Sequence, residues 1–177
     1  IGLVGSEMCI RDRYKHMDTS DSIPLEETLE ALGELVKQGK VRQIGLSNET
    51  PWGTMKYLEL AETKSLPRVA SIQNAYNLVN RGFEIGLSEV AMHEQVGLLA
   101  YSPLAQGTLT GKYLGGQMPQ GSRLALFGDG PLMMRYKGDK TQQAIEMYVN
   151  LAKKYEIDPA QLAIQFCNIQ PFVTSTI

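Results

Sequence analysis

Residues 96–102, with the sequence VGLLAYS, form a short run that is apolar nearly throughout. A run of this length and composition is typical of a β-strand that is covered on both faces. Strands of this kind occur in parallel sheets, because the helices that connect parallel strands pack against the faces of the sheet. Residues 96–102 therefore predict a strand covered on both faces, as in a parallel sheet.

The segments on either side of this run alternate between helical and strand patterns. Apolar residues at three- and four-residue spacing predict helices over 24–38, 50–64, 83–95, 141–155 and 159–169. Further strands are predicted over 41–47, 68–76 and 171–177. Four strands with their helices make half of a (β/α)8 barrel, which typically needs about 250 residues. A doubly wound sheet is the structural alternative, but no glycine-rich dinucleotide turn follows any of these strands.

Local signals mark where several of these helices begin and end. Pro24 suits a first helical turn, and Gly39 follows the same helix as a stop signal. Thr50–Pro51 and Asp158–Pro159 each combine a capping side chain with a proline at the first helical position. Residues 103–138 lack clear periodicity, and a connection this long inside a compact domain is usually functional or mobile.

The composition is that of one soluble globular domain. Of 177 residues, 43% are hydrophobic and 20% are charged. The net charge of −2 shows no excess of positive charge, which binding to nucleic acid or an anionic membrane would favour. No apolar run approaches the roughly 20 residues that span a bilayer, and the start is no signal peptide. Two cysteines, Cys9 and Cys167, cannot form a disulfide framework, which favours a cytoplasmic location.

The residues at the carboxyl ends of three predicted strands indicate where ligands would bind, because parallel α/β folds bind ligands there. These residues are Ser47, Asn48, Gln73, Asn74, Tyr101 and Ser102. Amides and hydroxyls can hydrogen-bond a carboxamide, and a tyrosine ring can stack on a flat heterocycle. Such groups suit a cofactor site without an acid or a base. The alternative for any one of them is a capping or half-buried structural residue.

Four stretches carry a resemblance to a known family: KVRQIGLSNETPWG, SIQNAYNLVNR, GLLAYSPLAQGTLTGKY and DPAQLAIQFCNIQPFVTSTI. Together they resemble the C-terminal half of an aldo/keto reductase of the Tas-like bacterial subgroup, from about Tyr14 to Ile177. The resemblance implies strands five to eight of a (β/α)8 barrel. It also implies NADPH as cofactor and hydride transfer to a small-molecule aldehyde or ketone.

The resemblance also assigns cofactor contacts, position by position. Ser47, Asn48 and Gln73 match groups that hold the nicotinamide carboxamide, and Tyr101 matches the aromatic residue that stacks on the nicotinamide ring. The loop along the pyrophosphate is matched by Ser102, Pro103, Leu104, Gly107 and Leu109. Lys112 and Arg123 match cationic contacts to cofactor phosphate.

The catalytic residues of the family are not matched. The family uses an Asp, Tyr, Lys and His from its first four strands, and its last cofactor loop follows the eighth strand. His16 matches a variable loop, so no catalytic residue is expected in this chain, and the chain alone is expected to be inactive. A non-catalytic relative that binds nucleotide as a sensor or accessory subunit is the alternative function.

The first residues have an unusual character. SEMCIRD, residues 6–12, is the translation of TCA-GAG-ATG-TGT-ATA-AGA-GAC, a string that resembles a transposase-based sequencing adapter. The chain also begins with Ile, which suggests truncation. We therefore expect residues 1–13 to be foreign to the protein and residues 14–177 to be a partial reductase domain.

Three other features of the sequence do not indicate a functional site. GTLTGK, residues 107–112, has three residues between its glycines and Tyr113 after Lys112, so it does not fit a phosphate-binding P-loop. His93 lacks a partner at metal-ligand spacing and is expected on a helix surface, so no metal site is predicted. Cys167 lies on the apolar face of a predicted helix, which favours a core position.

Overall fold

The computed structural model describes residues 23–128 and 135–177. The predictions for residues 1–13, Tyr14 and His16 lie outside the described residues. The chain forms two compact units: a first unit from Ile1–Asn74 and Phe83–Leu99, and a second unit from Ala75–Gly82 and Ala100–Ile177.

The described elements alternate as the sequence predicts. The α-helices are α1 (Leu25–Lys37), α2 (Pro51–Thr63), α3 (Leu87–His93), α4 (Arg123–Phe127), α6 (Asp139–Lys154) and α7 (Pro159–Asn168). Short 3₁₀ helices are η1 (Gly82–Glu84), η2 (Ala105–Thr110) and η3 (Leu114–Gly116). The strands are β1 (Ile44–Ser47), β2 (Val69–Ala75), β3 (Gly97–Tyr101) and β4 (Val173–Thr176), in the sheet order β1-β2-β3-β4. None of the described helices is long and apolar enough to cross a lipid bilayer.

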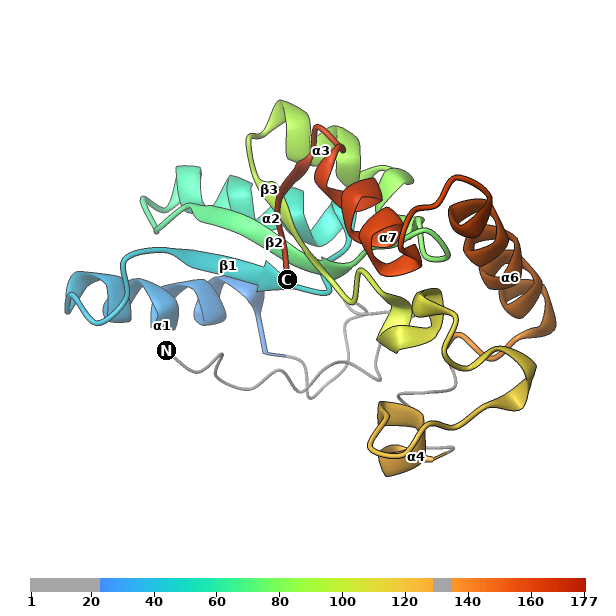
Figure 1. Ribbon diagram of the computed structural model, residues 1–177. Coiled ribbons are helices and arrows are strands. Elements are labelled where there is room, and N and C mark those ends of the chain that lie inside the picture. The colour runs from blue at the N-terminus through green and yellow to red at the C-terminus, as the bar shows by residue number, and fades with distance from the viewer. Residues whose placement is uncertain (1–22, 129–134) are drawn as a thin grey trace. The chain divides into compact units, whose positions relative to one another are not determined.

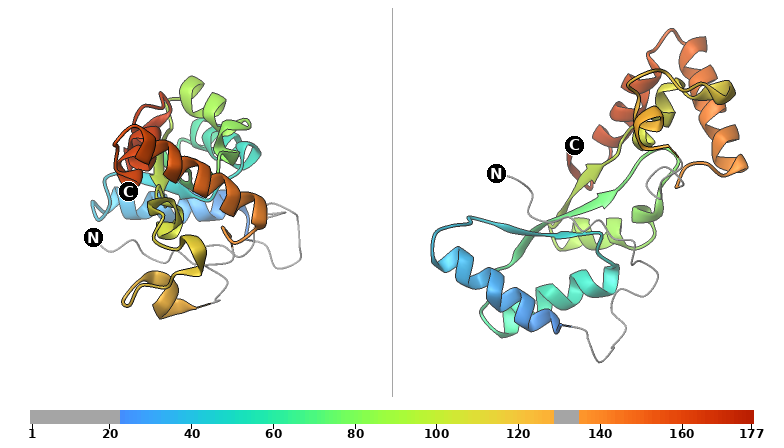
Figure 2. Two further views of the ribbon diagram at one scale, coloured as in Figure 1. Left: turned by 45° about the vertical axis from the view of Figure 1, so that its right-hand side comes forward. Right: turned by 90° about the horizontal axis from the view of Figure 1, so that it is seen from below.

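The first unit packs its helices against one face of its strands. Strands β1 and β2 pair in parallel, with Leu46 opposite Ile72 and Ser47 opposite Gln73. Leu46 and Ile72 are buried, whereas Ser47 is exposed. Figure 2 shows α1, α2 and α3 on the same side of β1 and β2. The face of the strands that carries Leu46 and Ile72 is therefore the one that the helices cover, and Ser47 lies on the opposite face.

The second unit has its own apolar core. Its central cluster consists of Ala105, Leu109, Tyr136, Ile145, Val149 and Ala163. These residues come from η2, α6, α7 and the segment before α6, and Figure 1 shows α6 and α7 side by side. The core thus fixes the 3₁₀ segment that follows β3 against two helices.

Two of the predicted helix starts are confirmed in detail. Thr50 caps α2 by accepting a hydrogen bond from the Gly53 N–H (3.0 Å), and Pro51 is the first helical residue. Asp158 accepts bonds from two N–H groups at the start of α7. A cap of this kind stabilises a helix by about 1 kcal/mol. Pro24, by contrast, precedes α1 as its N-cap residue instead of occupying the first turn.

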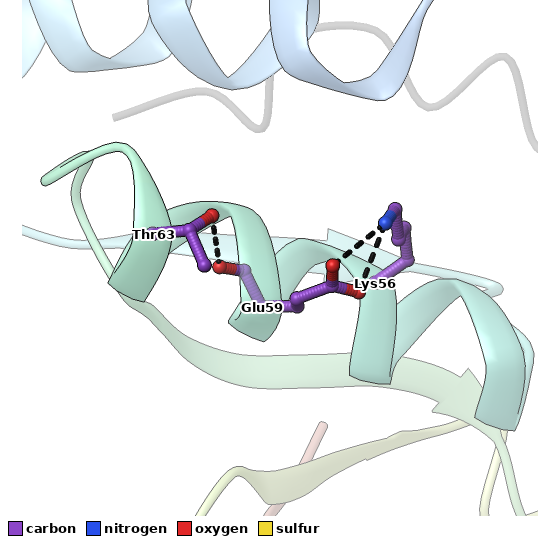
Figure 3. Close-up of polar contacts among 3 residues, drawn as sticks. All are labelled: Lys56, Glu59 and Thr63. Atoms are coloured by element: carbon purple, nitrogen blue, oxygen red, sulfur yellow. Dashed lines mark hydrogen bonds and ion pairs between the residues drawn. The ribbon is translucent and has the colours of Figure 1, made fainter.

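The surface of α2 carries ordinary helix contacts. Lys56 pairs with the Glu59 carboxylate at 2.9 Å, and the Thr63 hydroxyl donates to the Glu59 carbonyl at 2.8 Å (Figure 3). Exposed ion pairs at this spacing contribute well under about 1 kcal/mol. These contacts stabilise the helix locally and do not involve the residues at the strand ends.

The predicted helix over 83–95 is too long. The structure has η1 first and α3 only from Leu87, because Gly86 lies between them with φ +97°. A Cβ at Gly86 would lie 3.3 Å from Pro51 Cγ, so both the backbone angle and the space favour glycine. Apolar spacing continues across this break, which is why the sequence pattern does not reveal it.

The prediction that β3 is covered on both faces needs correction. Leu98 and Ala100 are fully buried, but Gly97, Leu99 and Tyr101 on the other face are only half-buried. Within the described residues the strand is therefore covered completely on one face alone. The predicted strands over 41–47 and 171–177 are also shortened, to β1 and β4, and the helix over 141–155 begins earlier, at Asp139.

Candidate functional site

In the first unit, the ends of β1 and β2 bring three predicted site residues together. Ser47 lies opposite Gln73 in the strand ladder, and the Asn48 N–H donates to the Gln73 carbonyl at 2.9 Å. The Asn48 side-chain amide is 3.5 Å from the Ser47 hydroxyl. Asn48 has φ +50°, a left-handed conformation that asparagine tolerates better than most residues. The turn after β1 thus places amide and hydroxyl groups beside Gln73.

Asn74, at the end of β2, holds the next residue of the same turn. Its side-chain carbonyl accepts a hydrogen bond from the Glu49 N–H, and its amide donates to the Glu49 carbonyl, both at 3.0 Å. The buried Glu49 carboxylate in turn accepts a bond from the Thr50 N–H at 2.7 Å, beside the start of α2. The carboxylate is therefore engaged with the helix start.

In the second unit, Tyr101 ends β3 with its ring half-buried. Its carbonyl accepts a hydrogen bond from the Tyr76 N–H at 3.2 Å. Its hydroxyl accepts one from Arg135 Nη1 at 3.4 Å, and this contact raises the pKa of the Arg135 guanidinium. Sequence reasoning did not identify Arg135, which lies far along the chain from Tyr101.

Asn77 holds the residue that follows Tyr101. This fully buried side chain donates to the Ser102 carbonyl at 2.9 Å and to the Tyr136 hydroxyl at 3.0 Å, and it accepts from the Val79 N–H at 3.0 Å. Ser102 itself has φ +57°. A buried amide with its donors and acceptor satisfied fixes its partners strongly, so the turn after β3 has a defined course.

The turn and η2 contain the residues predicted to run along a pyrophosphate: Ser102, Pro103, Leu104, Gly107 and Leu109. Gly107 has φ +92°, and a Cβ there would lie 3.1 Å from Lys112 Nζ, so the ammonium of Lys112 lies over the Gly107 backbone. Leu109 is a core residue with 1% exposure. Among the described residues, Gln106 Oε1 is the buried side-chain oxygen without a hydrogen-bond partner.

Tyr113 connects the two predicted cationic contacts. Lys112 Nζ lies 5.2 Å from the centroid of the Tyr113 ring, and the Tyr113 hydroxyl accepts a hydrogen bond from the Leu124 N–H at 3.3 Å. Leu124 follows Arg123, which is exposed in the first turn of α4. Ser122 caps this helix through the Ala125 N–H. Tyr113 therefore contacts Lys112 through its ring and the residue after Arg123 through its hydroxyl.

The remaining candidates have structural roles. His93 is exposed at the end of α3, as predicted. Cys167 is fully buried in α7, and burial raises the pKa of its thiol to about 11, so the core position is confirmed. In the part of the chain that the structure describes, no three His, Cys, Asp or Glu side chains gather as a metal site requires.

Sequence comparisons place this chain among known proteins. The profile of the Aldo/keto reductase family matches residues 12–177. Protein tas of Escherichia coli (strain K12) is 50% identical over 164 residues, which cover 93% of this chain and 46% of that protein. An aldo-keto reductase of Babesia bovis is 41% identical over 168 residues, covering 92% of this chain and 58% of the relative.

A third relative is the L-glyceraldehyde 3-phosphate reductase of Escherichia coli (strain K12), 33% identical over 167 residues that cover 93% of this chain and 47% of the enzyme. The chain thus spans about half the length of these curated relatives. The family match extends over nearly the whole chain, and the α/β fold with its four-stranded sheet agrees with it. The chain therefore belongs to the aldo/keto reductase family of oxidoreductases and is Tas-like within it.

Proposed function

We propose that this chain is the cofactor-binding half of a cytoplasmic NADPH-dependent reductase of small aldehydes or ketones. Strands β1 to β4 would be strands five to eight of a (β/α)8 barrel. Family membership and the alternation of strands with helices support this assignment. The buried free thiol of Cys167 is consistent with a reducing compartment.

The arrangement of Ser47, Asn48 and Gln73 is the observation that carries the proposal. The Ser47 hydroxyl and the Asn48 and Gln73 amides lie at the ends of paired strands, where a carboxamide finds both donors and acceptors. The neighbouring carboxylate of Glu49 is buried against the Thr50 N–H. This donor set suits a neutral ligand group such as a nicotinamide carboxamide.

In the second unit, the turn after β3 suits the anionic part of the cofactor. Tyr101 offers a ring for stacking, and Lys112 and Arg123 offer positive charge. The ammonium of Lys112, which lies over the Gly107 backbone, supports an anionic group at this turn, and the unpartnered Gln106 Oε1 offers an acceptor for a hydroxyl of the same ligand. Arginine binds phosphate through paired N–H groups, which favours the extra phosphate of NADPH over NADH.

When bound, NADPH supplies a hydride for the carbonyl carbon. The residues of this chain would bind and orient the cofactor: Ser47, Asn48 and Gln73 at the carboxamide, and Tyr101 at the nicotinamide ring. The pyrophosphate would lie along Ser102, Pro103, Leu104, Gly107 and Leu109, with Lys112 and Arg123 near phosphate. The proton donor is proposed to lie on strands that this chain does not contain.

The test is cofactor titration and turnover in the complete protein that contains this chain. We expect NADPH to quench or shift protein fluorescence with saturation and to be oxidised in the presence of a panel of aldehydes and ketones. Binding without turnover across the panel favours the alternative, a nucleotide-binding accessory protein. The absence of saturable binding for both nicotinamide cofactors would refute the proposal.

A further inference from the structure

We propose that Asn74 is a positioning residue for the carboxamide contacts, an inference that rests on the proposed function. Its side-chain amide makes the reciprocal pair of 3.0 Å hydrogen bonds with the backbone of Glu49. In a parallel ladder a residue bonds through its N–H and its carbonyl to two residues of the neighbouring strand, and the Asn74 side chain offers Glu49 both bonds from one amide. Asn74 therefore continues the pairing of β1 with β2 beyond the last backbone pair, Ser47 with Gln73.

The end of β1 and the turn after it are thus aligned with two successive residues of β2. Ser47 is the register partner of Gln73, the Asn48 N–H donates to the Gln73 carbonyl at 2.9 Å, and Glu49 is held by Asn74. Asn48, in the middle, has φ +50°. An unfavourable backbone conformation persists only where the surrounding contacts fix it, and the Asn74–Glu49 pair supplies the fixed point on the far side of Asn48.

The chemistry of the pair requires a carboxamide. An aspartate would still accept from the Glu49 N–H, but its second oxygen would face the Glu49 carbonyl, which also only accepts. Alanine would remove both bonds and leave the Glu49 N–H and carbonyl without these partners. In either case the turn would lose the two-sided contact that fixes it next to Asn48, while the buried apolar face of β1 and β2 would stay intact.

A purely structural role for Asn74 would not distinguish one end of the cofactor from the other. Loss of the Asn74–Glu49 pair should weaken contacts to the carboxamide and leave contacts to the rest of the cofactor unchanged. NADPH and 2′-phospho-ADP-ribose share the phosphates and the adenosine, but only NADPH carries nicotinamide. Their two affinities therefore report separately on the turn after β1 and on the remaining cofactor contacts.

The experiment measures both affinities in the complete protein, for the wild type, Asn74→Ala, Asn74→Asp and the control Asn150→Ala, which removes an exposed amide from α6. We expect Asn74→Ala to weaken NADPH binding by about three- to tenfold, the scale of one or two net hydrogen bonds, with less than about a twofold change for 2′-phospho-ADP-ribose. Asn74→Asp should have the same selective effect. Asn150→Ala should change neither affinity.

Equal weakening of both ligands, or no change in either, would overturn the positioning role. If Asn74→Ala does not fold, Asn74→Asp gives the same comparison while keeping one of the two bonds. Failure of the underlying proposal looks different: the wild type would then bind NADPH no more tightly than 2′-phospho-ADP-ribose, and Asn48→Ala would leave both affinities unchanged.

Discussion

Arg135 donates a hydrogen bond from Nη1 to the hydroxyl of Tyr101, across 3.4 Å, within the second unit. The bond joins the end of β3 to the segment before α6. The bond involves the hydroxyl of Tyr101, whereas the proposed stacking on a heterocycle would involve the faces of the ring. The contributions of the ring and of the hydroxyl of Tyr101 can therefore be tested separately.

This separation predicts different effects for two substitutions. Tyr101→Ala should weaken NADPH binding in the complete protein by about 0.5–1.5 kcal/mol or more, the scale of aromatic pair contacts. Tyr101→Phe keeps the ring and should retain most of the affinity. Isothermal titration of both variants measures this, with Tyr155→Ala, an exposed tyrosine after α6, as the control. Unchanged binding in a folded Tyr101→Ala protein would return Tyr101 to a structural role.

The positive charges of Lys112 and Arg123 predict the choice of cofactor. Arg123→Ala and Lys112→Ala should each weaken NADPH binding by about fivefold, roughly 1 kcal/mol for an exposed charge contact, because each removes a positive charge near phosphate. Arg123→Ala should affect NADH less, since NADH lacks the additional phosphate. Titrations with both cofactors at low and high salt test this, with Lys140→Ala as a control for lost charge. Equal affinity for the two cofactors that survives Arg123→Ala would contradict the assignment.

The buried thiol of Cys167 predicts a pH dependence of stability. Its pKa is raised by burial from 9.0 to about 11, so the folded state keeps the proton at a pH where the unfolded state releases it. The contribution of this group is present below pH 9.0 and is lost as the pH rises to about 11. Urea unfolding of the complete protein at several pH values measures the loss. The steepness of that loss should decrease in Cys167→Ala, and identical pH profiles would contradict the prediction.

The chain by itself should have no reductase activity and should fold poorly. Strands β1 and β4 end the sheet of the described residues, and unpaired strand edges favour association. Without a positioned proton donor, a general-acid contribution of roughly 10²–10⁴-fold would also be missing. Residues 14–177 and the full 177-residue chain can be purified and assayed for NADPH oxidation, with circular dichroism and sizing. Turnover above background from either would refute this prediction.

Local signals predicted the parts of the fold that depend on neighbouring residues. Thr50 and Asp158 cap their helices because the capping side chain and the N–H groups that it accepts from lie within three residues. Apolar periodicity found the long helices for the same reason. It missed the break at Gly86, because the reason for that glycine is its approach to Pro51, which lies far away in the sequence.

The site was predicted less completely, for a related reason. The strand ends indicated candidate ligand contacts, but not the residues that hold those candidates in place. Asn77 contacts Ser102 and Tyr136, which lie 25 and 59 residues away, and Arg135 lies 34 residues from Tyr101. Contacts at these separations have no periodic signature in a single sequence. The helix α4 within 103–138 was also missed, since five residues are too few to show a pattern.

The path of the chain through its two units has a consequence for how the protein could be divided. The chain leaves the first unit after Asn74, returns at Phe83, and leaves again after Leu99. No single cut in the backbone therefore separates one unit cleanly from the other. A gene fusion, a protease site or an expression boundary placed anywhere between these positions would leave each product with a piece of the other unit. Because the segments of the two units alternate along the chain, we expect the two units to be kept together in the gene and to fold together.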